Sequence, residues 1–106
     1  MTYSVRLTRQ AQDDLDRLFD FIIEREISRP GGGDLALADA ALTAIRAGIH
    51  TLASSPFTCR KVGTNPLLRE LIISFGRSGY VALFEIDDAS TVTVLAVRHQ
   101  LEDDYH

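Results

Sequence analysis

The chain has 106 residues, of which 45% are hydrophobic and 25% charged, and its formal net charge is −4. This length allows one domain with a single core but not two, so we expect residues 1–106 to fold as one unit. The negative charge argues against a protein whose whole surface binds nucleic acid, since such proteins are usually basic.

The only cysteine, Cys59, excludes an internal disulfide and is typical of a reducing compartment. The N-terminus has neither the apolar core nor the cleavage pattern of a signal peptide. No apolar run approaches the roughly 20 residues that a membrane-crossing helix needs. We therefore expect a cytoplasmic protein with no membrane partner.

The first predicted element is a strand over residues 3–7, where apolar and polar side chains alternate. Tyr3, Val5 and Leu7 would then face inward. Thr8 follows and is suited to be the N-cap of a helix. The chain is thus expected to open with a strand that leads directly into a helix.

Two amphipathic helices follow, separated by a turn at Gly31-Gly32-Gly33. The first should end near Ser28, because Pro30 restricts the residue before it, and Asp34 is suited to cap the second. Apolar residues recur at helical spacing in both: Ala11, Leu15, Leu18 and Ile22, then Ala38, Leu42, Ile45, Ile49 and Leu52. The second helix ends at residues 54–56, so the pair should form an antiparallel hairpin.

The last part of the chain is rich in strand patterns. We expect a loop over residues 57–66 and strands over residues 67–75, 80–86 and 91–97. The connections between these strands are short enough for hairpins, which predicts a three-stranded antiparallel meander. The predicted fold class is α+β, with the helices packed on the sheet and the N-terminal strand joining it as an added edge or an inserted neighbour.

Charge is unevenly distributed along the chain. The first helix carries the acidic residues Asp13, Asp14, Asp16, Asp20, Glu24 and Glu26. Between Thr58 and Val81 four basic residues, Arg60, Lys61, Arg69 and Arg77, oppose Glu70 alone, a net of +3. This pattern predicts a solvated acidic helix face and a modest positive patch on the sheet.

Several motifs occur in a fixed order. The opening strand leads to Ala11, Asp14 and Leu15, and Leu67-Leu68-Arg69-Glu70-Leu71 enters the predicted sheet. The middle strand reads Gly79-Tyr80-Val81-Ala82-Leu83-Phe84-Glu85-Ile86, and the last ends in Val94-Leu95-Ala96-Val97-Arg98-His99. Together they resemble the ParE/RelE superfamily of bacterial toxins from type II toxin–antitoxin systems. The resemblance implies a cognate antitoxin as partner, a hetero-oligomer with it, and no cofactor.

The superfamily contains two functional classes. RelE-like members are ribosome-dependent mRNA endonucleases with an arginine directly after the first tyrosine of the middle strand. Here Tyr80 is followed by Val81, which cannot donate to phosphate. ParE-like members instead poison DNA gyrase, and the resemblance favours this class. A ribosome-dependent ribonuclease and a non-toxic antitoxin-binding module remain alternatives.

The basic and aromatic residues of the sheet region are the candidate site residues. Candidates for contacting gyrase or the antitoxin are Arg69, Arg77, Tyr80, Arg98 and His99. If the protein were a ribonuclease, the candidate catalytic residues would be Lys61, Arg77, Arg98 and His99. Structural roles compete with these: Arg69 paired with Glu85 or Asp87, and His99 hydrogen-bonded where it closes the sheet.

No metal site or sequence-specific nucleic-acid contact is expected. His50, His99 and His106 lack the spacing of metal ligands. Cys59 has no partner histidine motif and is expected to be an inert thiol.

Overall fold

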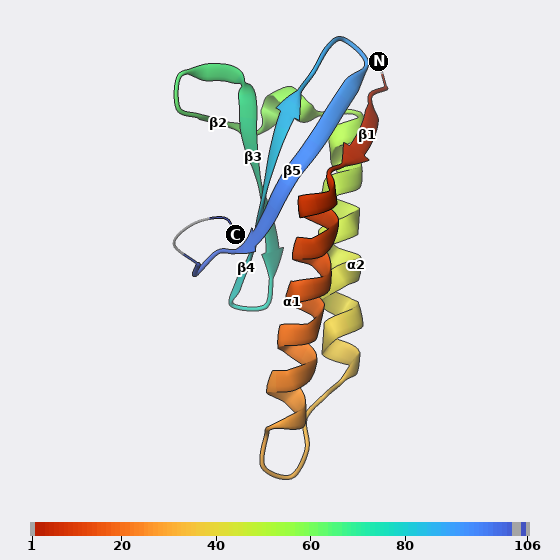
Figure 1. Ribbon diagram of the computed structural model, residues 1–106, viewed down its shortest axis with the longest axis vertical. Coiled ribbons are helices and arrows are strands. Elements are labelled where there is room, and N and C mark those ends of the chain that lie inside the picture. The colour runs from red at the N-terminus through yellow and green to blue at the C-terminus, as the bar shows by residue number, and fades with distance from the viewer. Residues whose placement is uncertain (1, 103–104, 106) are drawn as a thin grey trace.

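We describe residues 2–102 and 105 of a computed structural model. Met1, Asp103, Asp104 and His106, including the third of the histidines considered as metal ligands, lie outside the described residues. Helices α1 (Arg9–Ile27) and α2 (Ala36–His50) form an antiparallel hairpin against one face of a sheet, as predicted (Figure 1). The strands are β1 (Ser4–Leu7), β2 (Arg60–Val62), β3 (Asn65–Phe75), β4 (Ser78–Ile86) and β5 (Thr91–His99). The α+β class is confirmed.

The five strands lie in the order β1-β5-β4-β3-β2. Strands β3, β4 and β5 form the predicted antiparallel meander. Strand β1 is an added edge, paired in parallel with β5 so that Val5 lies opposite Val92. This pairing brings the N-terminal strand against the first half of the last strand, and it places α1 directly beside β5.

The prediction of a loop over residues 57–66 was wrong. A short 3-10 helix (Pro56–Thr58) is followed by β2, which pairs antiparallel with β3 so that Lys61 lies opposite Arg69. The register shifts after Lys61, and β3 begins at Asn65. Strand β2 has only three residues, two basic and one apolar, which is too short for a strand period to be visible, so the sequence carries no signal for it.

The helix ends follow the predicted chemistry closely. The Thr8 hydroxyl accepts a hydrogen bond from the Ala11 N–H at 3.1 Å, which confirms it as the N-cap of α1. At α2 the N-cap position is Leu35, one residue later than expected. The Asp34 carboxylate nevertheless accepts the Ala36 N–H at 3.0 Å and so serves the same purpose.

The glycine turn between the helices is built around Glu26. Gly31 and Gly32 have φ of 78° and 85°, and a Cβ on Gly33 would lie 2.4 Å from the Glu26 carbonyl oxygen. The Glu26 side chain is 1% exposed and accepts the Asp34 N–H at 3.1 Å. That bond, together with Arg25 and Arg29, lowers the carboxyl pKa. Glu26 therefore does not belong to a solvated acidic face.

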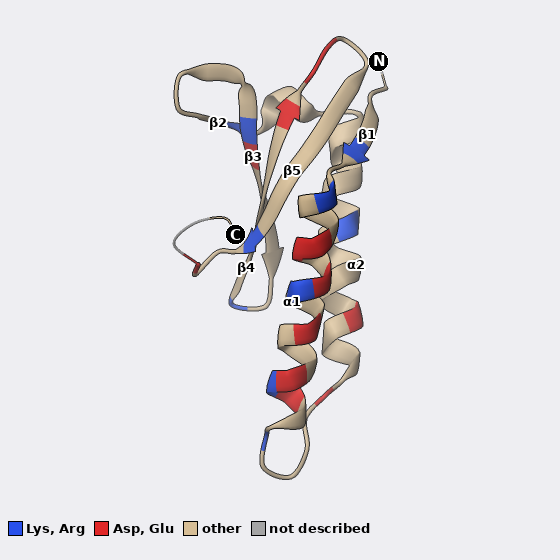
Figure 2. Cartoon of the chain, in the orientation of Figure 1, with Lys and Arg blue, Asp and Glu red and all other residues tan. Residues whose placement is uncertain are grey.

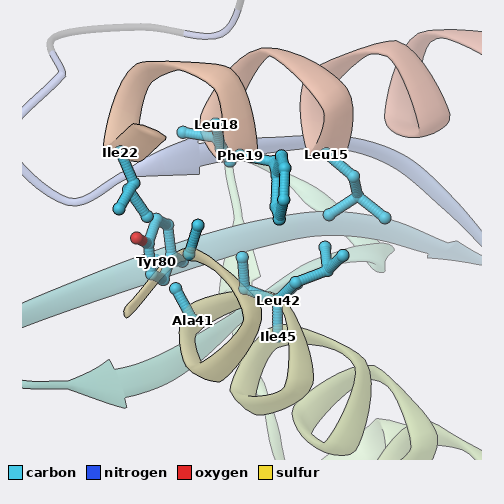
Figure 3. A pocket seen from close by; sticks show the side chains of 9 residues that line it. Leu15, Leu18, Phe19, Ile22, Ala41, Leu42, Ile45 and Tyr80 are labelled. Atoms are coloured by element: carbon cyan, nitrogen blue, oxygen red, sulfur yellow. The ribbon is translucent and has the colours of Figure 1, made fainter. Parts of the chain in front are cut away.

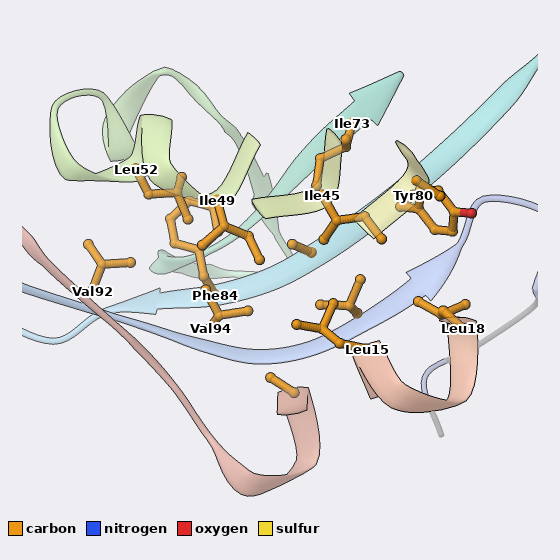
Figure 4. Packing of buried hydrophobic residues seen from close by; sticks show 14 of the residues in the cluster. Leu15, Leu18, Ile45, Ile49, Leu52, Ile73, Tyr80, Phe84, Val92 and Val94 are labelled. Carbon is orange, nitrogen blue, oxygen red and sulfur yellow. The ribbon is translucent and has the colours of Figure 1, made fainter. Parts of the chain in front are cut away.

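The core lies between the hairpin and the sheet (Figure 4). Its largest fully buried apolar side chains are Phe84, Ile45 and Leu52. Helix α2 approaches β3 closely at Gly48, where a Cβ would lie 2.8 Å from the Ile73 side chain. The hairpin extends beyond the sheet at its glycine turn, which leaves part of α1 without strands beneath it (Figure 1).

Candidate binding groove

A groove of about 580 Å³ lies between α1 and the end of β5. It is lined by Arg17, Leu18, Phe21, Ile22, Arg25, Tyr80, His99, Leu101 and Glu102, and we call it the α1–β5 groove. Phe21 is 59% exposed and Leu101 is 80% exposed. Large apolar side chains that line an open groove are typical of binding surfaces.

On the face of α1 that lines the groove, arginine side chains alternate with an apolar one. Arg17, Phe21 and Arg25 are spaced by four residues and so lie one above the other. The Arg25 guanidinium lies 6.0 Å from the centroid of the Phe21 ring. Basic and acidic residues both occur along this helix (Figure 2), so its surface is not uniformly acidic.

Asp14 is buried behind the groove rather than solvated, which corrects the predicted acidic face. Its side chain is 1% exposed and accepts the backbone N–H of Val97 at 2.9 Å. Because β1 ends opposite Val94, the Val97 N–H has no strand beside it, and Asp14 supplies its hydrogen-bond acceptor. Arg17 lies 3.8 Å from the same carboxylate and 2.6 Å from Glu102. Asp14 therefore fixes α1 against β5, and Arg17 holds the segment after β5.

Tyr80 lines the α1–β5 groove and also packs among the apolar side chains between the two helices, where Figure 3 shows it beside Ile22 and Ala41. It is 4% exposed, so it offers a partner only the edge of its ring. Burial raises the pKa of its phenol, and the positive charge of Arg25 opposes that rise. Tyr80 thus contributes to the shape of the groove more than to its polar contacts.

His99 is held by two hydrogen bonds at the end of β5. Its Nδ1 accepts the Leu101 N–H at 3.1 Å, and its Nε2 lies 3.0 Å from the Ser78 hydroxyl. Because Nδ1 is an acceptor, we assign the ring proton to Nε2, which then donates to Ser78. The ring also meets Tyr80 edge-on at 5.4 Å. A histidine bonded in this way cannot remove the proton of Ser78.

Arg98 points away from the groove. Its Nη1 donates to the carbonyl oxygen of Glu102 at 2.8 Å, and its guanidinium lies 5.1 Å from the ring of Tyr105. The Tyr105 hydroxyl donates to Glu70, and burial raises the phenol pKa. Val81 lies opposite Arg98 and is 2% exposed. Tyr105 thus packs against Arg98 and Glu70 on the face of the sheet opposite the helices.

Arg69 has a structural environment that differs from the prediction. Its guanidinium donates to the carbonyl oxygens of Phe57, Cys59 and Pro66, each at 2.9 Å, and lies 5.2 Å from the Phe57 ring. The side chain is 8% exposed, so the expected pairing with Glu85 or Asp87 was wrong. It binds the 3-10 turn before β2 to the sheet.

The predicted positive patch is largely neutralised. Arg60 is exposed but lies 2.7 Å from Glu70, and Arg69 is buried, so Lys61 and Arg77 are the exposed bases of that stretch with no ion pair among the described residues. By strand register Lys61 is separated from His99 by about 13 Å along the strands and about 14 Å across them. These two candidate ribonuclease residues do not share a site.

The remaining expectations concern metal ligands, the single thiol and membrane-crossing helices. Among residues 2–102 and 105, no three His, Cys, Asp or Glu side chains are placed to hold a metal ion. Cys59 is half-buried, and burial raises the pKa of its thiol, which lowers its reactivity. No helix within this part of the chain is long and apolar enough to cross a membrane.

Of the predicted contact residues, Tyr80 and His99 line the α1–β5 groove and Arg77 lines an adjoining pocket, while Arg69 and Arg98 line neither. The missed lining residues are Arg17, Phe21, Arg25, Leu101 and Glu102. A signal was present, because Phe21 lies off the apolar stripe of its helix and has an arginine four residues away on either side.

Comparisons with known proteins identify the relatives of this chain. The family model for the ParE toxin of type II toxin–antitoxin systems (parDE) matches residues 5–104. Toxin RelE1 of Caulobacter vibrioides is 31% identical over 102 residues, which cover 96% of this chain and 98% of that protein.

Two solved structures share the fold. One is described as the chromosomal ParDE TA system from P. aeruginosa, with a TM-score of 0.70, 20% identity and coverage of 92% of this chain and 96% of that one. The other is the toxin–antitoxin complex RelBE2 from Mycobacterium tuberculosis, with a TM-score of 0.61, 22% identity and coverage of 94% and 100%. With a matching family model and a related toxin over nearly its whole length, the chain belongs to the ParE toxin family of type II toxin–antitoxin systems, within the ParE/RelE superfamily.

Proposed function

We propose that this toxin acts in the cytoplasm by binding and poisoning DNA gyrase, and that a cognate antitoxin neutralises it. The observation that carries the proposal is the dispersal of the residues that a ribonuclease would need. Lys61 lies at the far end of the sheet, Arg98 is occupied on the opposite face, and Val81 is buried. A toxin without an assembled centre for proton transfer is best explained as a binding protein.

The hydrogen bonding of His99 supports the same proposal. A general base for the ribose hydroxyl needs an unprotonated nitrogen that faces the substrate. In His99 the unprotonated Nδ1 is occupied by the Leu101 N–H, and Nε2 donates to Ser78. Neither nitrogen is available as a base in this arrangement.

We assign the antitoxin to the α1–β5 groove. The groove exposes Phe21 and Leu101, and its two ends carry Arg17 and Arg25. An amphipathic segment that covers the exposed aromatic ring with its apolar face would bury this surface from water. The toxin and the antitoxin are therefore expected to form a stable hetero-oligomer.

A supercoiling assay tests the proposed target. Purified toxin is added to DNA gyrase and relaxed plasmid, with a matched reaction that also contains the protein encoded beside the toxin gene. We expect the toxin to block supercoiling and its neighbour to restore it. Normal supercoiling at saturating toxin would rule out gyrase as the target.

A ribosome-dependent ribonuclease is the second candidate, because Arg77 and His99 do line one pocket. It predicts mRNA cleavage in the ribosomal A site and loss of toxicity in His99→Ala. Intact transcripts during growth arrest would exclude it. Harmless overexpression together with tight antitoxin binding would instead identify a non-toxic antitoxin-binding module.

A further inference from the structure

A second, smaller pocket of about 190 Å³ adjoins the α1–β5 groove. It lies between the C-terminal part of α1, the β3–β4 turn and the end of β5, and we call it the basic notch after Arg25, Arg77, Ser78 and His99. Arg25, Tyr80 and His99 line both pockets. A chain that lies in the groove can therefore continue into the notch.

The notch presents hydrogen-bond donors. Arg77 is exposed in the turn and forms no hydrogen bond or ion pair within the described part of the chain. Arg25 uses its Nε for Glu26 at 3.2 Å, so its terminal nitrogens stay available. Because His99 donates to the Ser78 oxygen, the Ser78 hydroxyl can direct its own proton into the notch. Among residues 2–102 and 105, no Asp or Glu lines the basic notch.

We infer that the basic notch binds the side-chain carboxylate of an Asp or Glu in the antitoxin segment that occupies the α1–β5 groove. The inference rests on the proposed antitoxin binding and adds the chemistry of the partner. Two guanidinium groups and one hydroxyl match the acceptors of a carboxylate, which arginine binds with two parallel hydrogen bonds.

At the end of the groove that carries Arg17, the antitoxin does not need to supply a carboxylate. Both terminal nitrogens of Arg17 already donate to Glu102, at 2.6 and 3.5 Å, whereas Arg25 uses only its Nε for Glu26. Arg17 and Arg25 are about 12 Å apart along α1, with Phe21 between them. The expected occupant is thus a segment with an apolar centre over Phe21 and one acidic residue beyond it.

Binding of the co-encoded antitoxin, measured by calorimetry, tests the inference. We expect Arg77→Ala to weaken binding by about tenfold and Arg77→Glu to weaken it further, as for loss of a charge-assisted hydrogen bond. Arg46→Glu is the matched control, because Arg46 is exposed on α2 and lines neither pocket. This control should bind within about twofold of the wild type. Unchanged melting temperatures confirm that the variants fold.

A double-mutant cycle identifies the carboxylate. Each Asp of the antitoxin is changed to Asn and each Glu to Gln, and each variant is measured against the wild type and Arg77→Ala. We expect one position whose neutralisation weakens binding to the wild type but not to Arg77→Ala. If no acidic side chain couples to Arg77, or only the antitoxin's C-terminal carboxylate does, the inference is overturned.

The outcomes separate this inference from the proposed function. If the wild type, Arg77→Ala and Arg77→Glu bound the antitoxin equally tightly, the inferred role of the basic notch would be overturned, while the proposed antitoxin binding would stand. Failure of the antitoxin to bind the wild-type toxin at all would overturn both.

Discussion

The arginines at the two ends of the sheet differ in exposure and in hydrogen-bond partners. At the β2–β3 end, Arg69 is 8% exposed and its donors are used by three backbone carbonyls, while Arg60 pairs with Glu70. At the basic notch, Arg77 is exposed and Arg25 keeps its terminal nitrogens available. Positive charge in the sequence thus marks a structural contact at one end and a proposed binding surface at the other, and only the partners of each side chain distinguish them.

The largest expected effect is a loss of stability at the β2–β3 end of the sheet. Arg69→Ala should lower the free energy of unfolding by about 3 kcal/mol, because it removes three hydrogen bonds and the packing on Phe57. Arg69→Lys should recover little, since an ammonium lacks the planar fork of donors. Urea denaturation measures both. A loss below about 1 kcal/mol would show that the arginine is not a structural anchor.

The next effect concerns the attachment of α1 to β5. Asp14→Ala should cost about 2 kcal/mol in unfolding free energy, because the buried Val97 N–H loses its acceptor. The adjacent Asp13 is the control: its side chain is 63% exposed, so Asp13→Ala should cost less than about 0.5 kcal/mol. Equal losses in the two variants would contradict the assigned role of Asp14.

A smaller effect is expected at the groove, where binding rather than stability should change. Phe21→Ala should weaken antitoxin binding by about 1.5 kcal/mol, roughly tenfold, while the free energy of unfolding changes by less than about 0.5 kcal/mol. Phe57→Ala, which removes an exposed aromatic ring at the other end, should leave the affinity unchanged. Equal affinity losses for both would place the antitoxin elsewhere.

The smallest expected effect is a pH dependence that arises from Glu26. Its pKa is lowered below the ordinary value of 4.5, so its contribution to stability is complete at neutral pH and is lost as the pH falls through the lowered value. Glu26→Gln should therefore flatten the acid limb of a plot of urea midpoint against pH. An unchanged acid limb would show that other carboxylates cause it.

The sequence predicted most of the fold because periodicity and caps act locally. The two helices, the Thr8 cap and the meander all follow from residues that are close in the chain. Strand β2 could not be predicted, since its three residues show no strand period and pair with the distant strand β3, beside the contact of Arg69 with Cys59. The burial of Asp14 could not be predicted from the sequence either, because its hydrogen-bond partner Val97 is 83 residues away in the chain.

The groove was predicted less well than the fold for a related reason. Tyr80 and His99 stand on strands whose hairpins set their register, so their proximity could be expected. Phe21 reaches the groove only because α1 packs beside β5, a consequence of the parallel β1–β5 pairing. The tautomer of His99 likewise depends on the chain turning back after the strand, which places the Leu101 N–H at its Nδ1.

The central claim is that this toxin acts by binding and not by turnover, and a titration tests it most directly. Purified toxin is added in increasing amounts to gyrase and, in parallel, to ribosomes programmed with mRNA. We predict that supercoiling stops at near-stoichiometric toxin while the mRNA stays intact at the same concentrations. Cleavage of A-site mRNA by toxin far below the ribosome concentration, with normal supercoiling, would contradict the account.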